Sequence, residues 1–233
     1  MKRKIFYLMI FALTVVAFSS CSKDEYNDTR ITYYPTLTMS GDNYMSWAKG
    51  SEFKDPGYKC LLNGQDVTGQ VTIKSNVDVT KSGLYTIVYS FTNSDGFSSS
   101  LTRTVFVADA SDAVEGLYKV NTGSYRLSGA TKTSYSSFGK DMYVEILKNG
   151  SKYSVSDFIG GYYDQGKGYG SNYAMTGNMT VADDGTISLL DSNLPGFGGS
   201  ATNFTGKFDL AKKTLSWSLA WSGMTFNLIL NKK

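Results

Sequence analysis

Short runs of alternating apolar and polar residues dominate the chain and restrict it to β structure. Tyr, Phe, Val and Thr recur in these runs, and Gly, Asn-Gly and Asp-Gly interrupt them. No stretch after the first 20 residues keeps a 3.6-residue apolar period for ten residues, so almost no helix is expected. Hairpin turns are predicted at four dipeptides between strand-like runs: Asn63-Gly64, Asp95-Gly96, Asn149-Gly150 and Asp184-Gly185. We therefore predict an all-β protein.

The first 20 residues have the pattern of a secretory signal peptide. Three basic residues precede an apolar run from Ile5 to Phe18, which is shorter than a membrane-spanning helix, and Ser19-Ser20 precede Cys21. This junction resembles the lipobox of bacterial lipoproteins. The resemblance implies that residues 1–20 are removed, that Cys21 becomes the lipidated first residue, and that residues 21–30 form a tether.

The residues after Cys21 carry a second resemblance, which concerns location. Ser22-Lys23-Asp24-Glu25 is similar to the surface-export signal of Bacteroidetes lipoproteins. The resemblance implies a protein anchored in the outer membrane by its lipid and exposed at the cell surface, with the periplasmic face as the alternative.

Loss of the leader changes the net charge. Three of the 23 Lys and Arg residues lie in the leader, so 20 basic residues face 20 acidic ones in the mature chain. This balance gives no reason to expect a nucleic-acid partner. Cys60 is the one cysteine besides Cys21, so no intrachain disulfide is predicted, and its strand-like surroundings favour burial.

Residues 31–108 are predicted to form the first domain, and residues 109–113 a linker. Asp55-Pro56-Gly57 and Asn63-Gly64 are turns, and Tyr85, Ile87 and Tyr89 share one strand face. This succession resembles the immunoglobulin-like domain found in insecticidal crystal proteins and in many bacterial surface proteins. The resemblance implies a β-sandwich that serves as a spacer or adhesion module, without catalytic residues.

Residues 114–233 are predicted to form a second β domain. Its opening, Glu115-Gly116-Leu117-Tyr118, resembles the first strand of lipocalin-like (calycin) barrels, which implies an antiparallel β-barrel or sandwich. In the last hairpin, Trp217 and Trp221 alternate with small residues around the turn at Ser222-Gly223. We expect Trp217 in the core and Trp221 near a rim.

The chain contains no histidine, which removes Ser-His-Asp catalysis and the usual zinc ligation. Glycoside hydrolysis needs two facing carboxylates, and the sequence offers three acid pairs: Asp141 with Glu145, Asp183 with Asp184, and Asp157 with Asp164. The first pair fits a solvated strand face and the second a turn. Nothing in the pattern signals a buried acid with a raised pKa, so no enzyme, metal site or cofactor is predicted.

Aromatic residues set among glycines are the candidate binding site. Sugar rings stack on aromatic faces, and their hydroxyls need polar partners such as carboxylates and amides. Two glycine-rich loops and the last hairpin supply such residues. The predicted glycan-binding residues are Tyr162, Tyr163, Asp164, Gln165, Tyr169, Asn172, Tyr173, Phe197 and Trp221. In the competing interpretation the tyrosines pack inward and the glycines only shape bulges.

Three functions from different classes remain open. A glycan-binding accessory protein fits an anchored, neutral β protein with exposed tyrosines, and resembles the outer-membrane lipoproteins that serve Bacteroidetes polysaccharide-uptake systems. Its expected partners are a polysaccharide or oligosaccharide and an outer-membrane transporter complex. A calycin-type carrier of a small apolar ligand would need a central cavity, and a structural or adhesive protein would need no small ligand.

Overall fold

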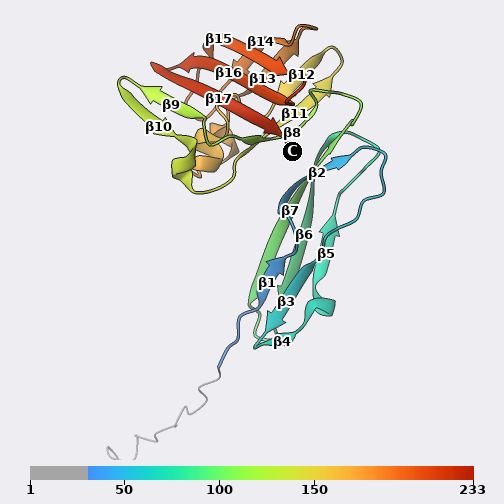
Figure 1. Ribbon diagram of the computed structural model, residues 1–233. Helices are drawn as coiled ribbons and strands as arrows, with labels where there is room; N and C mark the ends of the chain where they lie inside the picture. The colour runs from blue at the N-terminus through green and yellow to red at the C-terminus, as the bar shows by residue number, and fades with distance from the viewer. Residues whose placement is uncertain (1–30) are drawn as a thin grey trace, which may run out of the picture. The chain divides into compact units, whose positions relative to one another are not determined.

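The computed structural model describes residues 31–233, so the predicted leader, the export signal and Cys21 lie outside the described residues. Within 31–233, strands and turns dominate, and the helical segments are four single turns: η1 (Thr68–Gln70), η2 (Tyr135–Phe138), η3 (Tyr162–Gly166) and η4 (Ser171–Tyr173). No helix in that range is long and apolar enough to cross a membrane. The predicted all-β class is confirmed (Figure 1).

The N-terminal strands form two sheets of a sandwich. One sheet has the order β1-β3-β4, and the other has the order β2-β7-β6-β5 with β2 parallel to β7. The strands are β1 (Thr36–Met39), β2 (Tyr44–Ala48), β3 (Tyr58–Leu62), β4 (Gln65–Asp66), β5 (Thr72–Ser75), β6 (Gly83–Thr92) and β7 (Ser98–Ala108).

The sandwich core follows the predicted strand parity. Ile87 and Tyr89 are buried on one face of β6, and Tyr85 packs against the same cluster, as does the buried Cys60. Arg103 of β7 is also fully buried in this core, on the same strand face as Val105 and Val107. Hydrophobicity does not account for the burial of an arginine.

The C-terminal strands form an antiparallel barrel. Strands β8 and β11 to β17 pair in succession, and β17 pairs back to β8, which closes an eight-stranded ring. The hairpin of β9 and β10 extends from β17 (Figure 1). The strands are β8 (Gly116–Val120), β9 (Tyr125–Ser128), β10 (Thr131–Ser134), β11 (Tyr143–Asn149), β12 (Lys152–Val155), β13 (Thr176–Val181), β14 (Thr186–Asn193), β15 (Thr202–Asp209), β16 (Thr214–Trp221) and β17 (Met224–Lys232).

The predicted turns connect the strands they were expected to connect. The four Asn-Gly and Asp-Gly dipeptides join β3 to β4, β6 to β7, β11 to β12 and β13 to β14. The last hairpin has Trp221 opposite Met224 across Ser222-Gly223. Because this register places Trp217 opposite Leu228, both buried, the prediction of a core Trp217 is confirmed.

Side chains fill the barrel interior. Trp217, Phe158, Phe226 and Leu228 belong to one buried cluster that includes residues from every strand of the closed ring. A barrel of this size is wide enough for its own side chains or for one small ligand. The filled interior argues against the carrier alternative, which required a central cavity.

Candidate functional site

Five of the predicted site residues come together at one end of the barrel. Successive connections in an antiparallel barrel alternate between its two ends, so the β12–β13, β14–β15 and β16–β17 connections share an end. The first of these connections carries η3 and η4, the second carries Phe197, and Trp221 lies next to the third. We call this cluster the aromatic rim; its members are Tyr163, Tyr169, Tyr173, Phe197 and Trp221.

Phe197 is the centre of the aromatic rim. Its ring centroid lies 4.7 Å from that of Tyr173, 5.1 Å from that of Tyr163 and 5.9 Å from that of Trp221. Tyr169 stacks parallel to Tyr163 at 6.2 Å. Tyr169 and Phe197 are 54% and 50% exposed, whereas Tyr163 and Trp221 are each 9% exposed. The rim therefore presents two exposed rings on a buried aromatic base.

Two of the predicted site residues have structural roles instead. Tyr162 is only 1% exposed, and its ring packs edge to face on Phe226 in the core, so its predicted contact with a ligand is wrong. The Gln165 side chain is held by the backbone of Tyr143, which donates from its N–H at 2.9 Å and accepts from Nε2 at 2.7 Å. It fixes η3 to β11 and is not free to bind a sugar.

The other two predicted polar residues remain accessible. Asp164 is half-buried, and desolvation raises the pKa of its carboxyl, partly offset by Lys140. Asn172 is exposed, and its carbonyl oxygen accepts from the Gly196 N–H at 2.6 Å, which ties the two glycine-rich loops together. The Trp221 indole N–H donates to the Gly198 carbonyl at 3.0 Å and anchors the same loop. The backbone of both loops is thus fixed beneath the exposed rings.

Asp157 holds the loop between β12 and β13 in place, a role that the sequence pattern did not predict. One carboxylate oxygen accepts from the N–H groups of Ile159 and Met175, and the other from that of Gly161, each at 2.9 Å. Gly160 and Gly161 have φ of +63° and +75°, which bend the chain back over the carboxylate. Because these donors lie up to 18 residues away along the chain, sequence spacing does not show the network.

The environment of Asp157 also corrects the expectation that no buried acid has a raised pKa. Complete burial raises the pKa of Asp157 to about 7, although the three N–H donors favour its charged form. The neutral acid is therefore present in the folded state at pH values where an unfolded aspartate is ionised.

This shift predicts that the free energy of unfolding falls as the pH rises from 5 to 7.5. In that interval the folded protein gives up a proton that the unfolded chain has already lost, and the free energy of unfolding levels off only once the pH exceeds the folded-state pKa of about 7. No histidine in the chain titrates in this interval. Urea unfolding at a series of pH values measures the slope, and Asp157→Asn, which stays uncharged, should flatten it. Equal slopes in the two proteins would contradict the assignment.

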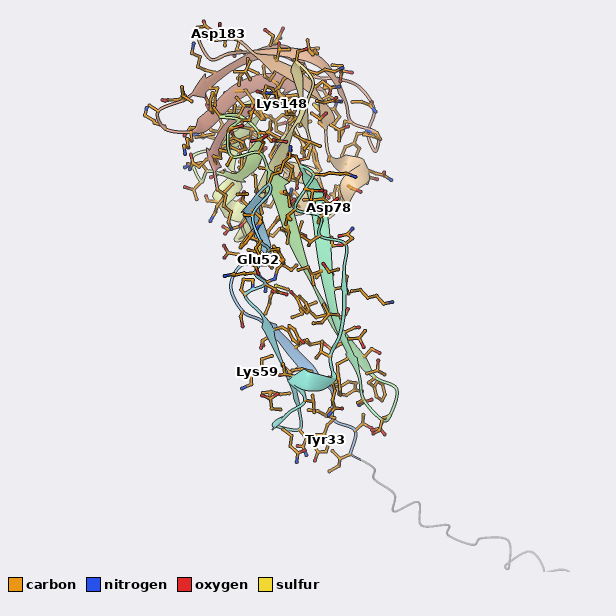
Figure 2. All side chains as sticks on the ribbon, turned by 90° about the vertical axis from the view of Figure 1, so that its right-hand side faces the viewer. Tyr33, Glu52, Lys59, Asp78, Lys148 and Asp183 are labelled. Atoms are coloured by element: carbon orange, nitrogen blue, oxygen red, sulfur yellow. The ribbon has the colours of Figure 1, made fainter. Side chains whose placement is uncertain are left out.

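Three acids of the candidate carboxylate pairs are held by structural partners. Asp157 is enclosed by N–H donors, Asp141 forms an ion pair with Lys119 at 2.7 Å, and Asp184 accepts from the Thr186 N–H at 2.8 Å. Asp183 lies in the exposed β13–β14 turn, at the outer edge of the barrel (Figure 2). These arrangements fit turn and loop stabilisation better than a pair of catalytic carboxylates.

Arg126 of β9 borders the aromatic rim, and no pattern around it in the sequence marks it as functional. Its guanidinium carbon lies 4.7 Å above the Tyr162 ring. Its Nη1 lies 3.4 Å from the Tyr163 hydroxyl and 3.6 Å from the Met224 sulfur. Its Nε is buried without a hydrogen-bond partner among residues 31–233. The rim therefore has a cation at its edge.

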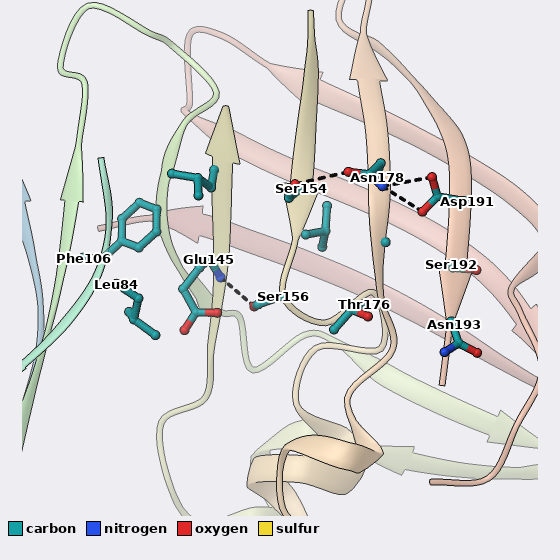
Figure 3. A pocket seen from close by; sticks show the side chains of 13 residues that line it. Leu84, Phe106, Glu145, Ser154, Ser156, Thr176, Asn178, Asp191, Ser192 and Asn193 are labelled. Atoms are coloured by element: carbon teal, nitrogen blue, oxygen red, sulfur yellow. Dashed lines mark hydrogen bonds between the residues drawn. The ribbon is translucent and has the colours of Figure 1, made fainter. Parts of the chain in front are cut away.

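A groove of about 580 Å³ on the outside of the barrel is a second concavity (Figure 3). Its barrel side carries polar residues of β11 to β14. The Asn178 amide donates to both carboxylate oxygens of Asp191 at 2.9 Å, and desolvation raises the pKa of Glu145. No sequence pattern indicates this groove, because its strand residues alternate as on an ordinary solvated strand face.

Comparisons with known proteins match the chain to a bacterial lipoprotein and to two domain families. A family model described as an Ig-like domain of bacterial surface proteins matches residues 37–107, and a model described as a C-terminal domain matches residues 107–232. The chain is 38% identical to the lipoprotein BT2262 from Bacteroides thetaiotaomicron, with a TM-score of 0.72 over 85% of this chain and 100% of that one. No curated protein matches.

A more distant match involves a Clostridium perfringens protein. A structure of CBM51-2 in complex with GlcNAc and INT domains from ZmpB is 18% identical over 52% of this chain and 29% of that one. Its TM-score of 0.28 is too low to support an argument about fold or function. Neither family model names a catalytic activity.

Proposed function

Because the chain belongs to the family of two-domain lipoproteins that includes BT2262, we propose that it is a non-enzymatic surface lipoprotein that binds glycans through its aromatic rim. The observation that carries this proposal is the pair of exposed rings, Tyr169 and Phe197, on a base of Tyr163, Tyr173 and Trp221. Aromatic faces of this kind stack on the C–H faces of sugars. Asp164 and Asn172 offer oxygen and amide partners for hydroxyls.

The proposed anchor is lipid on Cys21. The sequence around it supports removal of residues 1–20, and the polar segment 21–30 would separate the folded domains from the membrane. The Ser22-Lys23-Asp24-Glu25 segment supports export to the cell surface. The proposed setting is an outer-membrane polysaccharide-uptake system, in which this protein would deliver or hold glycan for a transporter complex.

The residue boundaries predicted for the two domains fit this scheme and remain a prediction. Strand β7 ends at Ala108 and β8 begins at Gly116, so the predicted linker 109–113 falls between them. In the proposal the sandwich is a spacer, and the barrel carries the binding face.

Removal of the two exposed rings is expected to weaken glycan binding about 5- to 150-fold. Aromatic contacts contribute about 0.5–1.5 kcal/mol each beyond their buried area, so two of them contribute about 1–3 kcal/mol. Affinity electrophoresis against a panel of polysaccharides measures the effect for the wild type and for a Tyr169→Ala/Phe197→Ala variant. At least one glycan should retard the wild type and leave the variant almost unretarded.

A matched control removes a second exposed tyrosine–phenylalanine pair. Tyr34 and Phe97 are 65% and 41% exposed, and their ring centroids lie 4.8 Å apart. Tyr34→Ala/Phe97→Ala should be retarded like the wild type. Absence of retardation by any glycan would contradict the function, in favour of a structural or adhesive protein. Equal retardation of the rim variant would contradict the site alone.

A further inference from the structure

The charge of Arg126 is not balanced by an acidic side chain in the described part of the protein. Its hydrogen-bond contacts there are the long ones to the Tyr163 hydroxyl and the Met224 sulfur. A buried guanidinium N–H without an acceptor is unfavourable, because it has lost its hydrogen bonds to water and gained none in the protein. This arrangement therefore destabilises the protein unless a further group accepts hydrogen bonds from the guanidinium.

Arg103 shows how the same protein treats an arginine with a purely structural role. Its Nε lies 3.3 Å from an Asp55 carboxylate oxygen, and its Nη2 donates to the carbonyls of Ser40 at 2.7 Å and Gly57 at 2.9 Å. Arg103 is thus paired and hydrogen-bonded throughout, as buried charges usually are. Arg126 lacks an equivalent set of partners.

The position of Arg126 connects it to the aromatic rim. It lies opposite Phe226 in the β9–β17 pairing, and paired residues of antiparallel strands point to the same side of the sheet. Its guanidinium therefore lies over the core ring of Tyr162 and reaches the hydroxyl of Tyr163, a member of the rim. A group bound against the rim would find this cation at its edge.

We propose that Arg126 makes the aromatic rim selective for acidic glycans, by binding the carboxylate of a uronic acid whose ring packs on Tyr169 or Phe197. Arginine binds a carboxylate through two parallel N–H bonds, which a neutral sugar cannot supply. This inference rests on the proposed glycan-binding function. It does not extend to the groove of Figure 3, which is lined by Glu145 and Asp191 and by no Lys or Arg.

The test compares two forms of one polymer, de-esterified polygalacturonate and its highly methyl-esterified form, which differ in charge. The wild type should bind the acidic form at least tenfold more tightly. Arg126→Gln should reduce this preference to less than threefold. Arg126→Lys, which keeps the charge but not the planar fork, should retain only part of the preference. Lys132→Gln removes a neighbouring exposed charge on β10 and should keep the full preference.

The outcomes separate this inference from the function on which it rests. Equal binding of both polymers by the wild type, or a preference unchanged in Arg126→Gln, overturns the role of Arg126 and leaves glycan binding intact. Binding of a neutral glycan without binding of either polymer does the same. If Lys132→Gln lost the preference for the acidic polymer to the same extent, the preference would come from the overall positive charge of the surface, and this result would also overturn the inference. A sulfated glycan that binds in place of the uronate would overturn the assignment to a carboxylate.

Discussion

Replacement of Asp157 with alanine is expected to destabilise the barrel by about 3–5 kcal/mol. The substitution leaves the N–H groups of Ile159, Gly161 and Met175 buried without an acceptor, and each unsatisfied group costs about 1–3 kcal/mol. The same loop carries Tyr163, Tyr169 and Tyr173, so its loss would also disperse the aromatic rim. Hydrogen exchange of the amides in residues 158–175, together with urea unfolding, measures the effect.

The matched control for this prediction is Asp183→Ala. Asp183 is an exposed aspartate in a turn of the same barrel, and its loss should change the free energy of unfolding by less than about 0.5 kcal/mol. An Asp157→Ala protein as stable as Asp183→Ala would show that the carboxylate does not hold the loop.

Replacement of Arg103 with methionine is expected to destabilise the sandwich by about 2–4 kcal/mol. The substitution leaves Asp55 without its cation and the carbonyls of Ser40 and Gly57 without their donor, while methionine fills part of the volume. Asp55 is partly exposed and can be solvated again, so the cost comes mainly from the hydrogen bonds that the buried guanidinium makes to the backbone. Faster hydrogen exchange of the β6 and β7 amides would locate the effect in the sandwich.

Here the control is Lys74→Met, at an exposed position of β5 in the same sheet. It loses a cation from the surface and should cost less than about 0.5 kcal/mol. If Arg103→Met matched Lys74→Met in stability, the Arg103 network would have no net structural value. Glycan binding by a folded Arg103→Met protein should be unchanged, since Arg103 contacts no residue of the rim.

Features encoded by neighbouring residues were predictable from the sequence. Asn-Gly and Asp-Gly turns carry their own backbone preference, so the hairpins at Asn149-Gly150 and Asp184-Gly185 follow from local chemistry. Parity in the last hairpin placed Trp217 in the core for the same reason. Closure of the ring was harder to predict from the sequence, because it depends on β17 pairing with β8, more than 100 residues earlier in the chain.

The same distinction between local and distant contacts applies to the residues of the candidate site. Aromatic residues in glycine-rich loops pointed to Tyr169 and Phe197, which are exposed and lie together. Tyr162 could not be distinguished from its neighbour, because η3 is a helical turn with no period-two alternation. The role of Asp157 and the position of Arg126 beside Tyr163 depend on contacts 18 and 37 residues apart, which no local pattern records.

Chemical-shift mapping tests the central claim most directly, that the aromatic rim is the glycan-binding face. An oligosaccharide of a glycan that retards the protein would be titrated into the ¹⁵N-labelled protein. If the aromatic rim binds the glycan, the largest amide shifts fall in residues 163–173 and 196–199, around Tyr169 and Phe197. Shifts concentrated in residues 154–156, 176–178 and 191–193, which line the groove of Figure 3, would contradict it.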